Sequence, residues 1–441
     1  MSPSRARVTA LALLGVVAIA IGAATLPALV GRPLDTRPRD TSQVAVGSPP
    51  ATLDATPSAV PSPAATPIPS PPTAVLDLRG IRVRLQVALD AGRASIAAPA
   101  IVASVLFADG SSWSGTSGVA DLASKRPLSV DTPFSIASVS KTFLAAEILQ
   151  LVEAGSLGLD DSVARRLPKV LVGGRALDPR ITIRELLDHT SGLRDYLTDK
   201  TLDAALVADP RRRWTPTEVL AYAGKPVAAP GAGYHYANTN YVLLGMIAEQ
   251  ATGTTLAEEY RARFFGPLGL ASATYQGVEP PIAKMPTAYR YKSVKLESPP
   301  ADITDGTEIR PFTSITTAAG AAGSVAASAP DLARWARALY GGEVLQPRTL
   351  LAMMADATAT AKLKPPYPYG LGVQVFTIDG RLSFGHSGRL VGARSAVRWF
   401  PEVGVAIAIV TNESRLDPAF IVRDLLAIVA PRLDAPGFPR R

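Results

Sequence analysis

SIASVSKTF, residues 135–143, is the stretch on which the interpretation of this chain depends. It places Ser135, Ser138, Ser140 and Lys141 in an otherwise apolar run. Residues three apart on a helix lie on the same face, so the amine of Lys141 can reach the hydroxyl of Ser138. Serine becomes a nucleophile when a neighbour takes its proton, and lysine does this when its pKa is lowered toward about 7–8. A capped helix with a solvated lysine is the other interpretation, because S-x-x-K alone is common.

A second motif, Tyr236-Ala237-Asn238, lies in GAGYHYANTNYVLLGMIAEQATG. Alternate residues of an extended segment point the same way, so Tyr236 and Asn238 can serve one site. Tyr236 is a candidate relay for the serine proton, and Asn238 is a candidate partner for a substrate amide or for Lys141. The following helix is expected to start near Thr239 or Asn240. A turn residue followed by a helix cap is the structural interpretation.

A third motif, His386-Ser387-Gly388, lies in SFGHSGRLVGARS at a strand-like position near the C-terminal end of the chain. Glycine at this position permits close approach of a substrate to the strand edge. The three histidines, His189, His235 and His386, show no metal-ligand spacing, so no zinc site is expected. The chain also lacks the G-x-S-x-G elbow and the G-x-x-x-x-G-K-[ST] loop, which argues against an α/β-hydrolase and a P-loop NTPase.

The composition excludes several classes of function. The chain has 441 residues, of which 47% are hydrophobic, enough for one large domain or two ordinary ones. Its net charge is +8, but the basic residues are scattered and not interleaved with aromatic residues, so no nucleic-acid partner is expected. The absence of cysteine removes disulfides, thiol chemistry and thiolate metal sites.

The first 30 residues have the pattern of a targeting segment. Arg5 and Arg7 precede an uncharged, mostly apolar stretch from Val8 to Val30. This stretch is either a cleaved signal peptide or a membrane anchor long enough to cross a bilayer, and both predict an extracytoplasmic protein. Residues 31–75 are rich in Pro, Ala, Thr and Ser, which predicts an extended linker.

Residues 76–435 are predicted to form a single α+β domain. Consecutive strands joined by short turns at both ends predict an antiparallel sheet, flanked by the N- and C-terminal helices, with a mainly helical lobe inserted. Ser328 is the expected N-cap of a helix that ends near Gly341. The expected elements are a helix at 78–93, a hairpin at 100–121 turning at Asp109-Gly110, a helix from about Ser138 to Gly155, a mixed helical region at about 142–320, strands at 370–379, 381–387, 392–401 and 404–412, and a final helix at 418–431.

The ordered set S-x-x-K, Y-x-N and H-x-G resembles the serine β-lactamase and penicillin-binding-protein superfamily, in its class C β-lactamase, D-Ala-D-Ala carboxypeptidase and esterase branch. The resemblance covers roughly residues 80–430 and implies the three-layer β-lactamase-like fold. It extends to further text, namely ITIRELLDHTSGL, YANTNYVLLGMIAEQATG, PLGL, SVAASAPDLARWARAL and YGLGVQV.

The resemblance implies a role for each motif residue. Ser138 would attack a carbonyl and form an acyl-enzyme, while Lys141 and Tyr236 would handle the proton. Asn238 would orient the substrate. The backbone N–H groups of Ser138 and Arg389 would form the oxyanion hole. His189 is interpreted as structural.

Within the third motif, the resemblance implies that Ser387 and Gly388 line the substrate site. His386, which replaces the lysine of K-T-G, would tune the pKa of Tyr236 or bind a substrate carboxylate when charged. This replacement weakens a claim of antibiotic hydrolysis. A dedicated deacylation glutamate is not identifiable.

The function predicted is therefore an exported serine hydrolase that needs no cofactor. Its substrate is a peptidoglycan stem peptide, an ester or a β-lactam, with carboxypeptidase or β-lactamase-like hydrolysis and esterase activity ranked equally. A membrane contact is expected only through an uncleaved N-terminal segment. The alternative from another class is a non-catalytic envelope binding protein that retains the fold.

Overall fold

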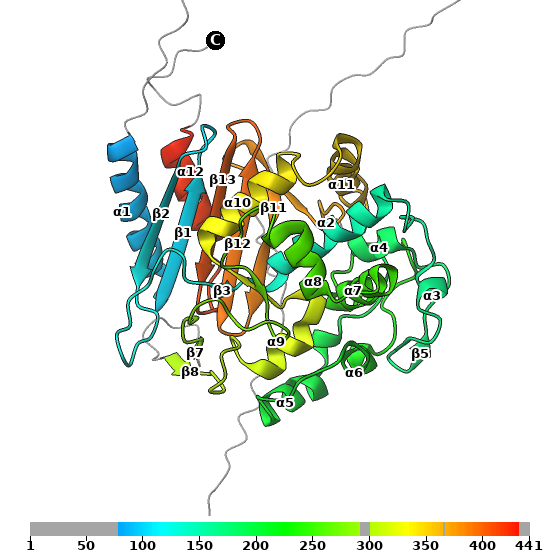
Figure 1. Ribbon diagram of the computed structural model, residues 1–441. Helices are drawn as coiled ribbons and strands as arrows, with labels where there is room; N and C mark the ends of the chain where they lie inside the picture. Colours follow the sequence, from blue (N-terminus) through cyan, green and yellow to red (C-terminus); the bar gives the residue numbers. More distant parts are fainter. Residues whose placement is uncertain (1–77, 292–299, 365–366, 432–441) are drawn as a thin grey trace, which may run out of the picture. The chain divides into compact units, whose positions relative to one another are not determined.

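The computed structural model describes residues 78–291, 300–364 and 367–431, which all belong to one compact unit (Figure 1). The predicted targeting segment at 1–30 and the linker at 31–75 lie outside the described residues, so these boundaries stay predictions. Within the described ranges, no helix combines the length and the apolar character needed to cross a membrane.

A six-stranded antiparallel sheet forms the centre of this unit, as the hairpin pattern predicts (Figure 1). The first two strands join the last four, because β1 pairs with β13 and opposes Ala103 to Ile409. The strand order is β10-β11-β12-β13-β1-β2. The strands are β1 (Ala100–Leu106), β2 (Ser112–Gly118), β10 (Gln374–Ile378), β11 (Arg381–Leu390), β12 (Ala393–Phe400) and β13 (Val405–Thr411).

Helices cover both faces of the sheet, which gives the three layers. On one face, α1 (Leu78–Ile96) and α12 (Ala419–Val429) pack beside each other, while α10 (Ala329–Tyr340) lies on the other (Figure 1). Alternate residues of β1 divide between two hydrophobic cores: Ile101 lies in the core with α1 and α12, and Val102 lies in the core with α10. Burial on both faces explains why β1 and β13 read as nearly continuous apolar runs.

A mainly helical lobe lies beside the sheet, as expected from the central region (Figure 1). Two of its long helices, α2 (Ser140–Glu153) and α7 (Asn238–Thr252), pack on each other. The other helices beyond the sheet layers are α3 (Val163–Arg166), α4 (Ile183–Leu187), α5 (Lys200–Ala208), α6 (Pro216–Leu220), α8 (Leu256–Tyr260), α9 (Thr313–Ala319) and α11 (Pro347–Thr360).

Short elements complete the described chain. A small sheet in the order β3-β9-β6 is formed by β3 (Phe134–Ser135), β9 (Val325–Ala327) and β6 (Thr274–Tyr275). Two hairpins pair β4 (Leu171–Val172) with β5 (Arg175–Ala176) and β7 (Tyr289–Tyr291) with β8 (Pro300–Asp302). The 3₁₀ turns of the described residues are η1 (Ala137–Val139), η2 (Tyr196–Thr198), η3 (Ala221–Ala223) and η5 (Gly320–Ala322), and η4 (Arg261–Phe265) is a π-helical turn.

Helix ends follow the capping signals of the sequence. Ser328 caps α10 as predicted, because its hydroxyl accepts a hydrogen bond from the backbone N–H of Asp331. The helix predicted to start at about Ser138 is regular α-helix only from Ser140, since the preceding turn η1 is a 3₁₀ helix. Ser138 therefore lies on a tighter turn than the sequence pattern indicates.

An aromatic contact joins the helical lobe to the sheet layer. The ring of Phe143 on α2 stacks on Trp335 of α10, with centroids 4.0 Å apart. The indole N–H of Trp335 donates a hydrogen bond to the hydroxyl of Thr142 at 2.8 Å. Because α10 packs directly on β1 and β13, this contact fixes the first turns of α2 relative to the sheet.

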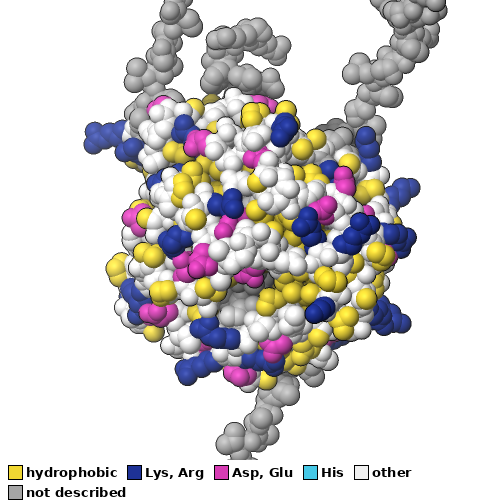
Figure 2. Space-filling model, turned by 45° about the vertical axis from the view of Figure 1, so that its right-hand side comes forward, with side chains coloured by type: hydrophobic (Ala, Val, Ile, Leu, Met, Phe, Trp, Pro, Cys, Tyr) yellow, Lys and Arg dark blue, Asp and Glu magenta, His cyan; other side chains and the backbone are white. Residues whose placement is uncertain are grey.

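Charges of both signs are mixed on the surface shown in Figure 2. Lys and Arg side chains are interspersed with Asp and Glu over this face. This face thus lacks the single basic patch that proteins binding polyanions present.

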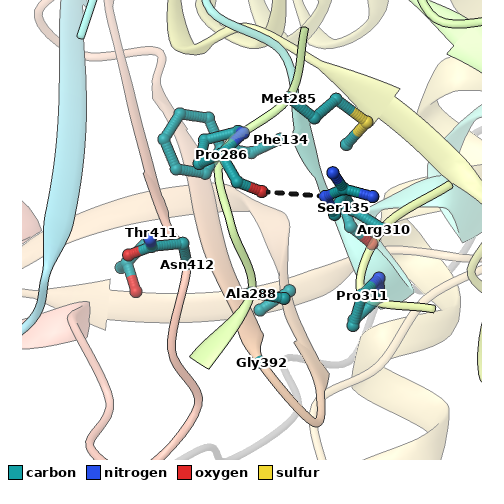
Figure 3. Close-up of a pocket in the computed structure, with 11 residues that line it drawn as sticks. Phe134, Ser135, Met285, Pro286, Ala288, Arg310, Pro311, Gly392, Thr411 and Asn412 are labelled. Carbon is teal, nitrogen blue, oxygen red and sulfur yellow. Dashed lines mark hydrogen bonds between the residues drawn. The ribbon is translucent and has the colours of Figure 1, made fainter. Parts of the chain in front are cut away.

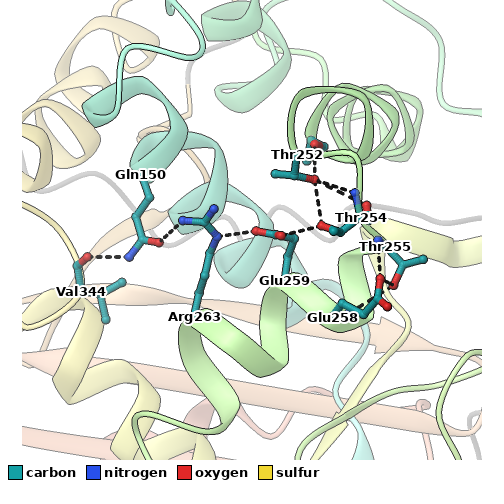
Figure 4. A network of polar contacts seen from close by, with 9 residues as sticks. Gln150, Thr252, Thr254, Thr255, Glu258, Glu259, Arg263 and Val344 are labelled. Carbon is teal, nitrogen blue, oxygen red and sulfur yellow. Dashed lines mark hydrogen bonds and ion pairs between the residues drawn. The ribbon is translucent and has the colours of Figure 1, made fainter.

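One carboxyl group is buried in the lobe without a visible partner. Glu147 of α2 is fully buried, and neither of its carboxyl oxygens has a hydrogen-bond partner among the described residues. A network links the nearby Gln150, Arg263 and Glu259, in which Arg263 donates to both other side chains (Figure 4). Burial raises the pKa of Glu147 to about 8, and the negative charge of Glu259 adds to this effect while Arg263 opposes it.

The raised pKa predicts that stability falls as pH rises. The folded state holds the Glu147 proton up to about pH 8, whereas an unfolded glutamate loses it near 4.5. This contribution is fully present below pH 4.5 and is lost as pH rises through 8. Glu147→Met is expected to remove on the order of 3 kcal/mol of the decline in unfolding free energy between pH 5 and 8. Urea unfolding at several pH values measures this decline, and the exposed Glu343→Met is the control. Equal declines in both variants would contradict the prediction.

Candidate active site

Ser138 lies at the junction between the sheet and the helical lobe. It is the middle residue of η1, directly before α2, and its side chain is half-buried. The preceding Ala137 has φ of +48°, a left-handed conformation that is uncommon for a residue with a side chain. A strained turn before a half-exposed serine is typical of positions where function requires a fixed side-chain direction.

Strand β11 approaches this turn closely at Gly388. A Cβ atom at Gly388 would lie 2.2 Å from the carbonyl oxygen of Ile136 and 3.2 Å from the Cβ of Ala137. The neighbouring Ser395 of β12 donates a hydrogen bond to the same carbonyl at 2.6 Å. Gly388 therefore allows β11 to pack closely on the turn η1 that carries Ser138, as expected where another backbone approaches a strand glycine.

The other two serines of the opening stretch point elsewhere. Ser140 accepts a hydrogen bond from the backbone N–H of Val325 at 3.0 Å. Ser135 lines a separate small cavity of about 10 Å³ with Arg310 and Asn412 (Figure 3). Its hydroxyl is buried without a protein partner among the described residues, and the cavity is about the size of one water molecule. Of the three serines, Ser138 is the one that contacts the lysine.

Lys141 is fully buried, and its amine has three oxygen neighbours. Nζ lies 3.1 Å from Ser138 Oγ, 2.7 Å from Asn238 Oδ1 and 2.8 Å from the carbonyl oxygen of Ala322. Burial lowers the pKa of Lys141 to about 7, against the opposing effect of the negative charge of Asp195. A large fraction of Lys141 is therefore neutral near pH 7 and able to accept a proton.

Tyr236 completes the contacts of the serine hydroxyl. Its phenol donates a hydrogen bond to Ser138 Oγ at 2.9 Å. Burial raises the pKa of Tyr236 above its ordinary value, so the side chain stays protonated at neutral pH. The geometry therefore suits Tyr236 as a proton donor, while Lys141 is the better base.

Asn238 is the first residue of α7, within two residues of the helix start predicted from the sequence. Its amide oxygen accepts from Lys141, and its amide nitrogen donates to Asp195 Oδ2 at 2.9 Å. Sequence reasoning did not single out Asp195 or the Ala322 carbonyl. The signal available for Asp195 was its place just after the family-like segment ITIRELLDHTSGL.

His386 of β11 is buried, and its ring nitrogens are hydrogen-bonded to groups other than Ser138. Its Nδ1 lies 2.6 Å from the carbonyl oxygen of Ser387 and therefore carries the proton, while Nε2 accepts from the phenol of Tyr369 at 2.8 Å. Burial, with the positive charge of Lys141 adding to it, lowers the pKa of His386 to about 3. His386 is thus neutral at pH 7. This result argues against the expectation that it binds a substrate carboxylate as a cation.

Ser387 and Arg389 lie on the opposite face of β11 from His386 and Gly388, because side chains alternate along a strand. The backbone N–H of Ser387 donates to Gln374 Oε1 at 3.0 Å, and the two side chains are 3.3 Å apart. Arg389 is exposed. The structure therefore does not bring these two side chains into contact with Ser138. The predicted oxyanion role of Arg389 belongs to its backbone N–H and does not depend on its side chain.

The contacts of His189 agree with a structural role beside the site. Its ring centroid is 4.2 Å from that of Tyr236, and its Nδ1 accepts from the backbone N–H of Ala237 at 3.3 Å. Its carbonyl accepts from the N–H of His235 at 2.8 Å. His189 therefore holds the Y-x-N segment in place.

Among the described residues, no group of three His, Cys, Asp or Glu side chains could hold a metal ion. What the cluster can do follows from its contacts. A serine hydroxyl, a base of pKa about 7 and a protonated phenol meet within hydrogen-bond distance, which is the equipment of acyl transfer.

Comparison with known proteins agrees with this chemistry. Residues 88–430 match the family described as Beta-lactamase. Penicillin-binding protein 4 of Amycolatopsis lactamdurans is 30% identical over 336 residues, which cover 74% of this chain and 84% of that protein. Esterase EstB of Burkholderia gladioli is 31% identical over 328 residues, covering 67% of this chain and 81% of the esterase.

Among solved structures, a D-stereospecific amidohydrolase from a Streptomyces species superposes with a TM-score of 0.66 at 30% identity. The match covers 80% of this chain and 99% of that one. The β-lactamase-like fold inferred from the motif order is thereby confirmed. The chain belongs to the β-lactamase family and is a serine hydrolase related to penicillin-binding proteins, esterases and amidohydrolases.

Proposed function

We propose that the protein is an exported hydrolase in which Ser138 forms an acyl-enzyme with a peptide or amide substrate that carries a D-amino acid. The observation that carries the proposal is the position of Ser138 Oγ between Lys141 Nζ at 3.1 Å and the Tyr236 phenol at 2.9 Å. Support for the substrate class comes from the name of the D-stereospecific amidohydrolase, 99% of which the match covers.

The contacts of Lys141 explain how it acts as the base. A neutral amine has two hydrogens and one lone pair. The oxygens of Asn238 and Ala322 accept the two hydrogens, which leaves the lone pair directed at Ser138 Oγ. As Oγ bonds to the carbonyl carbon, its proton moves to Nζ, and the carbonyl oxygen becomes an anion. The backbone N–H groups of Ser138 and Arg389 are the proposed donors to this anion.

Collapse of the tetrahedral intermediate releases the leaving group. The C–N bond breaks, the leaving nitrogen takes a proton from Tyr236, and the acyl group remains on Ser138. The Lys141 ammonium then gives its extra proton to the Tyr236 phenolate, which restores the neutral amine and the phenol. Deacylation repeats the sequence with water as nucleophile and Lys141 as its base, so no dedicated glutamate is required. Hydrolysis restores the serine and the neutral lysine.

Ester hydrolysis is the second candidate function. It is favoured by the neutral His386, which leaves the site without the cation that K-T-G supplies, and by the similarity to esterase EstB over 81% of that protein. An ester has a better leaving group than an amide and depends less on proton donation by Tyr236. The two candidates therefore differ in how strongly the rate depends on that tyrosine.

A substrate panel tests the proposal. We expect turnover of D-phenylalanine amide or of a peptide ending in D-Ala-D-Ala, with the L-amide at least about tenfold slower. Nitrophenyl esters and a chromogenic cephalosporin complete the panel. Turnover of esters alone would select the second candidate. Binding without turnover of any compound would contradict both and favour a non-catalytic envelope protein.

N-terminal sequencing of the native protein tests export, since a start beyond residue 22 would show a cleaved signal peptide.

A further inference from the structure

Asp195 connects to the base through a single amide side chain. It is buried, with 8% of its surface exposed. Its Oδ2 accepts from Asn238 Nδ2 at 2.9 Å, while its Oδ1 accepts from the backbone N–H of Leu197 at 3.1 Å and caps the turn η2. Burial raises the pKa of Asp195, while the N–H donors of Leu197 and Asn238 and the positive charge of Lys141 oppose this effect. The two N–H donors suit the ionised carboxylate, which only accepts hydrogen bonds.

The orientation of the Asn238 amide decides what Lys141 encounters. An amide has nearly the same shape in both orientations, but one end accepts hydrogen bonds and the other donates them. When Oδ1 faces Lys141, the amine donates one of its own hydrogens to Asn238 and keeps its lone pair for Ser138. With Nδ2 in that place, the amide N–H would compete with Ser138 for the lone pair.

We propose that Asp195 is a positioning residue of the reaction, whose carboxylate holds the Asn238 amide in the orientation that frees the lone pair of Lys141. This inference rests on the proposed function, in which Lys141 is the base for Ser138. Asp195 does not touch the serine. It acts through Asn238, across 43 residues of sequence.

Asp195 also adds a charge to the surroundings of the amine. Its negative charge opposes the effect of burial and raises the pKa of Lys141. Because neutral Lys141 is the active form, loss of this charge moves the acid limb of the kcat/KM profile to lower pH. The titratable groups that face or influence Lys141 from its neighbouring elements are Tyr236 and Tyr241, whose rings lie 5.1 and 5.3 Å from Nζ, together with Asp195, His189 and His386.

The variant that tests the proposal is Asp195→Asn, because its Oδ1 can still cap Leu197 while its amide nitrogen meets that of Asn238. We expect kcat to fall about 10- to 100-fold with a smaller change in KM, since a hydrogen bond to a charged group is lost and substrate contacts are not. The acid limb should move to lower pH. If this variant does not fold, Asp195→Ser, which keeps a capping oxygen, is expected to show the same shift.

Asp199→Asn is the matched control. Asp199 caps the neighbouring helix α5 through the N–H groups of Thr201 and Leu202 and has no contact with Asn238. It should keep the wild-type rate and acid limb. In the Asn238→Ala background, Asp195→Asn should add little further loss.

The role of Asp195 would be overturned if Asp195→Asn left the acid limb of the kcat/KM profile at its wild-type pH. It would also be overturned if the fold-loss in kcat of the Asp195→Asn, Asn238→Ala double variant equalled the product of the two single losses. The proposed function fails separately, if Ser138→Ala remains active.

Discussion

Replacing Ser138 by alanine is expected to lower kcat for any hydrolysed substrate by at least about 10⁴-fold, while the folded structure is retained. The side chain is half-buried and its loss creates little cavity, so the effect is chemical. Without Oγ no acyl-enzyme forms, and only transition-state binding by the remaining groups persists. Steady-state hydrolysis of the best substrate in the panel measures this loss.

Ser135→Ala is the matched control for this experiment. Ser135 lies three residues earlier in the same stretch, and its buried hydroxyl has no partner among the described residues. Its removal should leave both the rate and the stability close to wild type. Activity that survives Ser138→Ala but is lost in Ser135→Ala would mean that the nucleophile has been assigned to the wrong serine.

Lys141→Met is expected to lower kcat/KM by about 10²- to 10⁴-fold, the usual contribution of a positioned base. Methionine matches the length of the lysine stem and leaves no unpaired charge in the buried site. In the wild type, kcat/KM should rise with pH through about 7, because deprotonation of Lys141 creates the base. The variant should lose this limb. Rates measured between pH 5 and 9 with one ester and one amide test both points.

The exposed Lys169→Met provides the control, since it makes the same chemical change away from the site. It should retain the wild-type rate and pH dependence. A Lys141→Met variant that keeps the limb near pH 7 would show that another group is the base. The Tyr236 phenol cannot supply such a limb, because burial raises its pKa.

Local sequence patterns predicted much of the fold. The apolar strands near both ends of the domain predicted the antiparallel sheet, and Ser328 predicted the start of α10. The spacing of Ser138 and Lys141 survives the change from α-helix to a 3₁₀ turn, because both conformations place residues three apart on one side.

Other features of the site depend on contacts that sequence spacing does not encode. The Ala322 carbonyl reaches Lys141 across 181 residues, and a backbone oxygen has no residue-specific signature. Asp195 followed a family-like segment, but only folding shows that its carboxylate meets Asn238. The direction of His386 depends on Tyr369, which the apolar strand pattern leaves unassigned.

The central claim, that catalysis passes through an acyl group on Ser138, is tested most directly by intact-mass spectrometry of the protein with a fluorophosphonate or a slowly hydrolysed penicillin. The account predicts one adduct per chain, located by peptide mapping on Ser138 in the segment SIASVSKTF. Continued substrate turnover without any adduct, or an adduct on a residue other than Ser138, would contradict it.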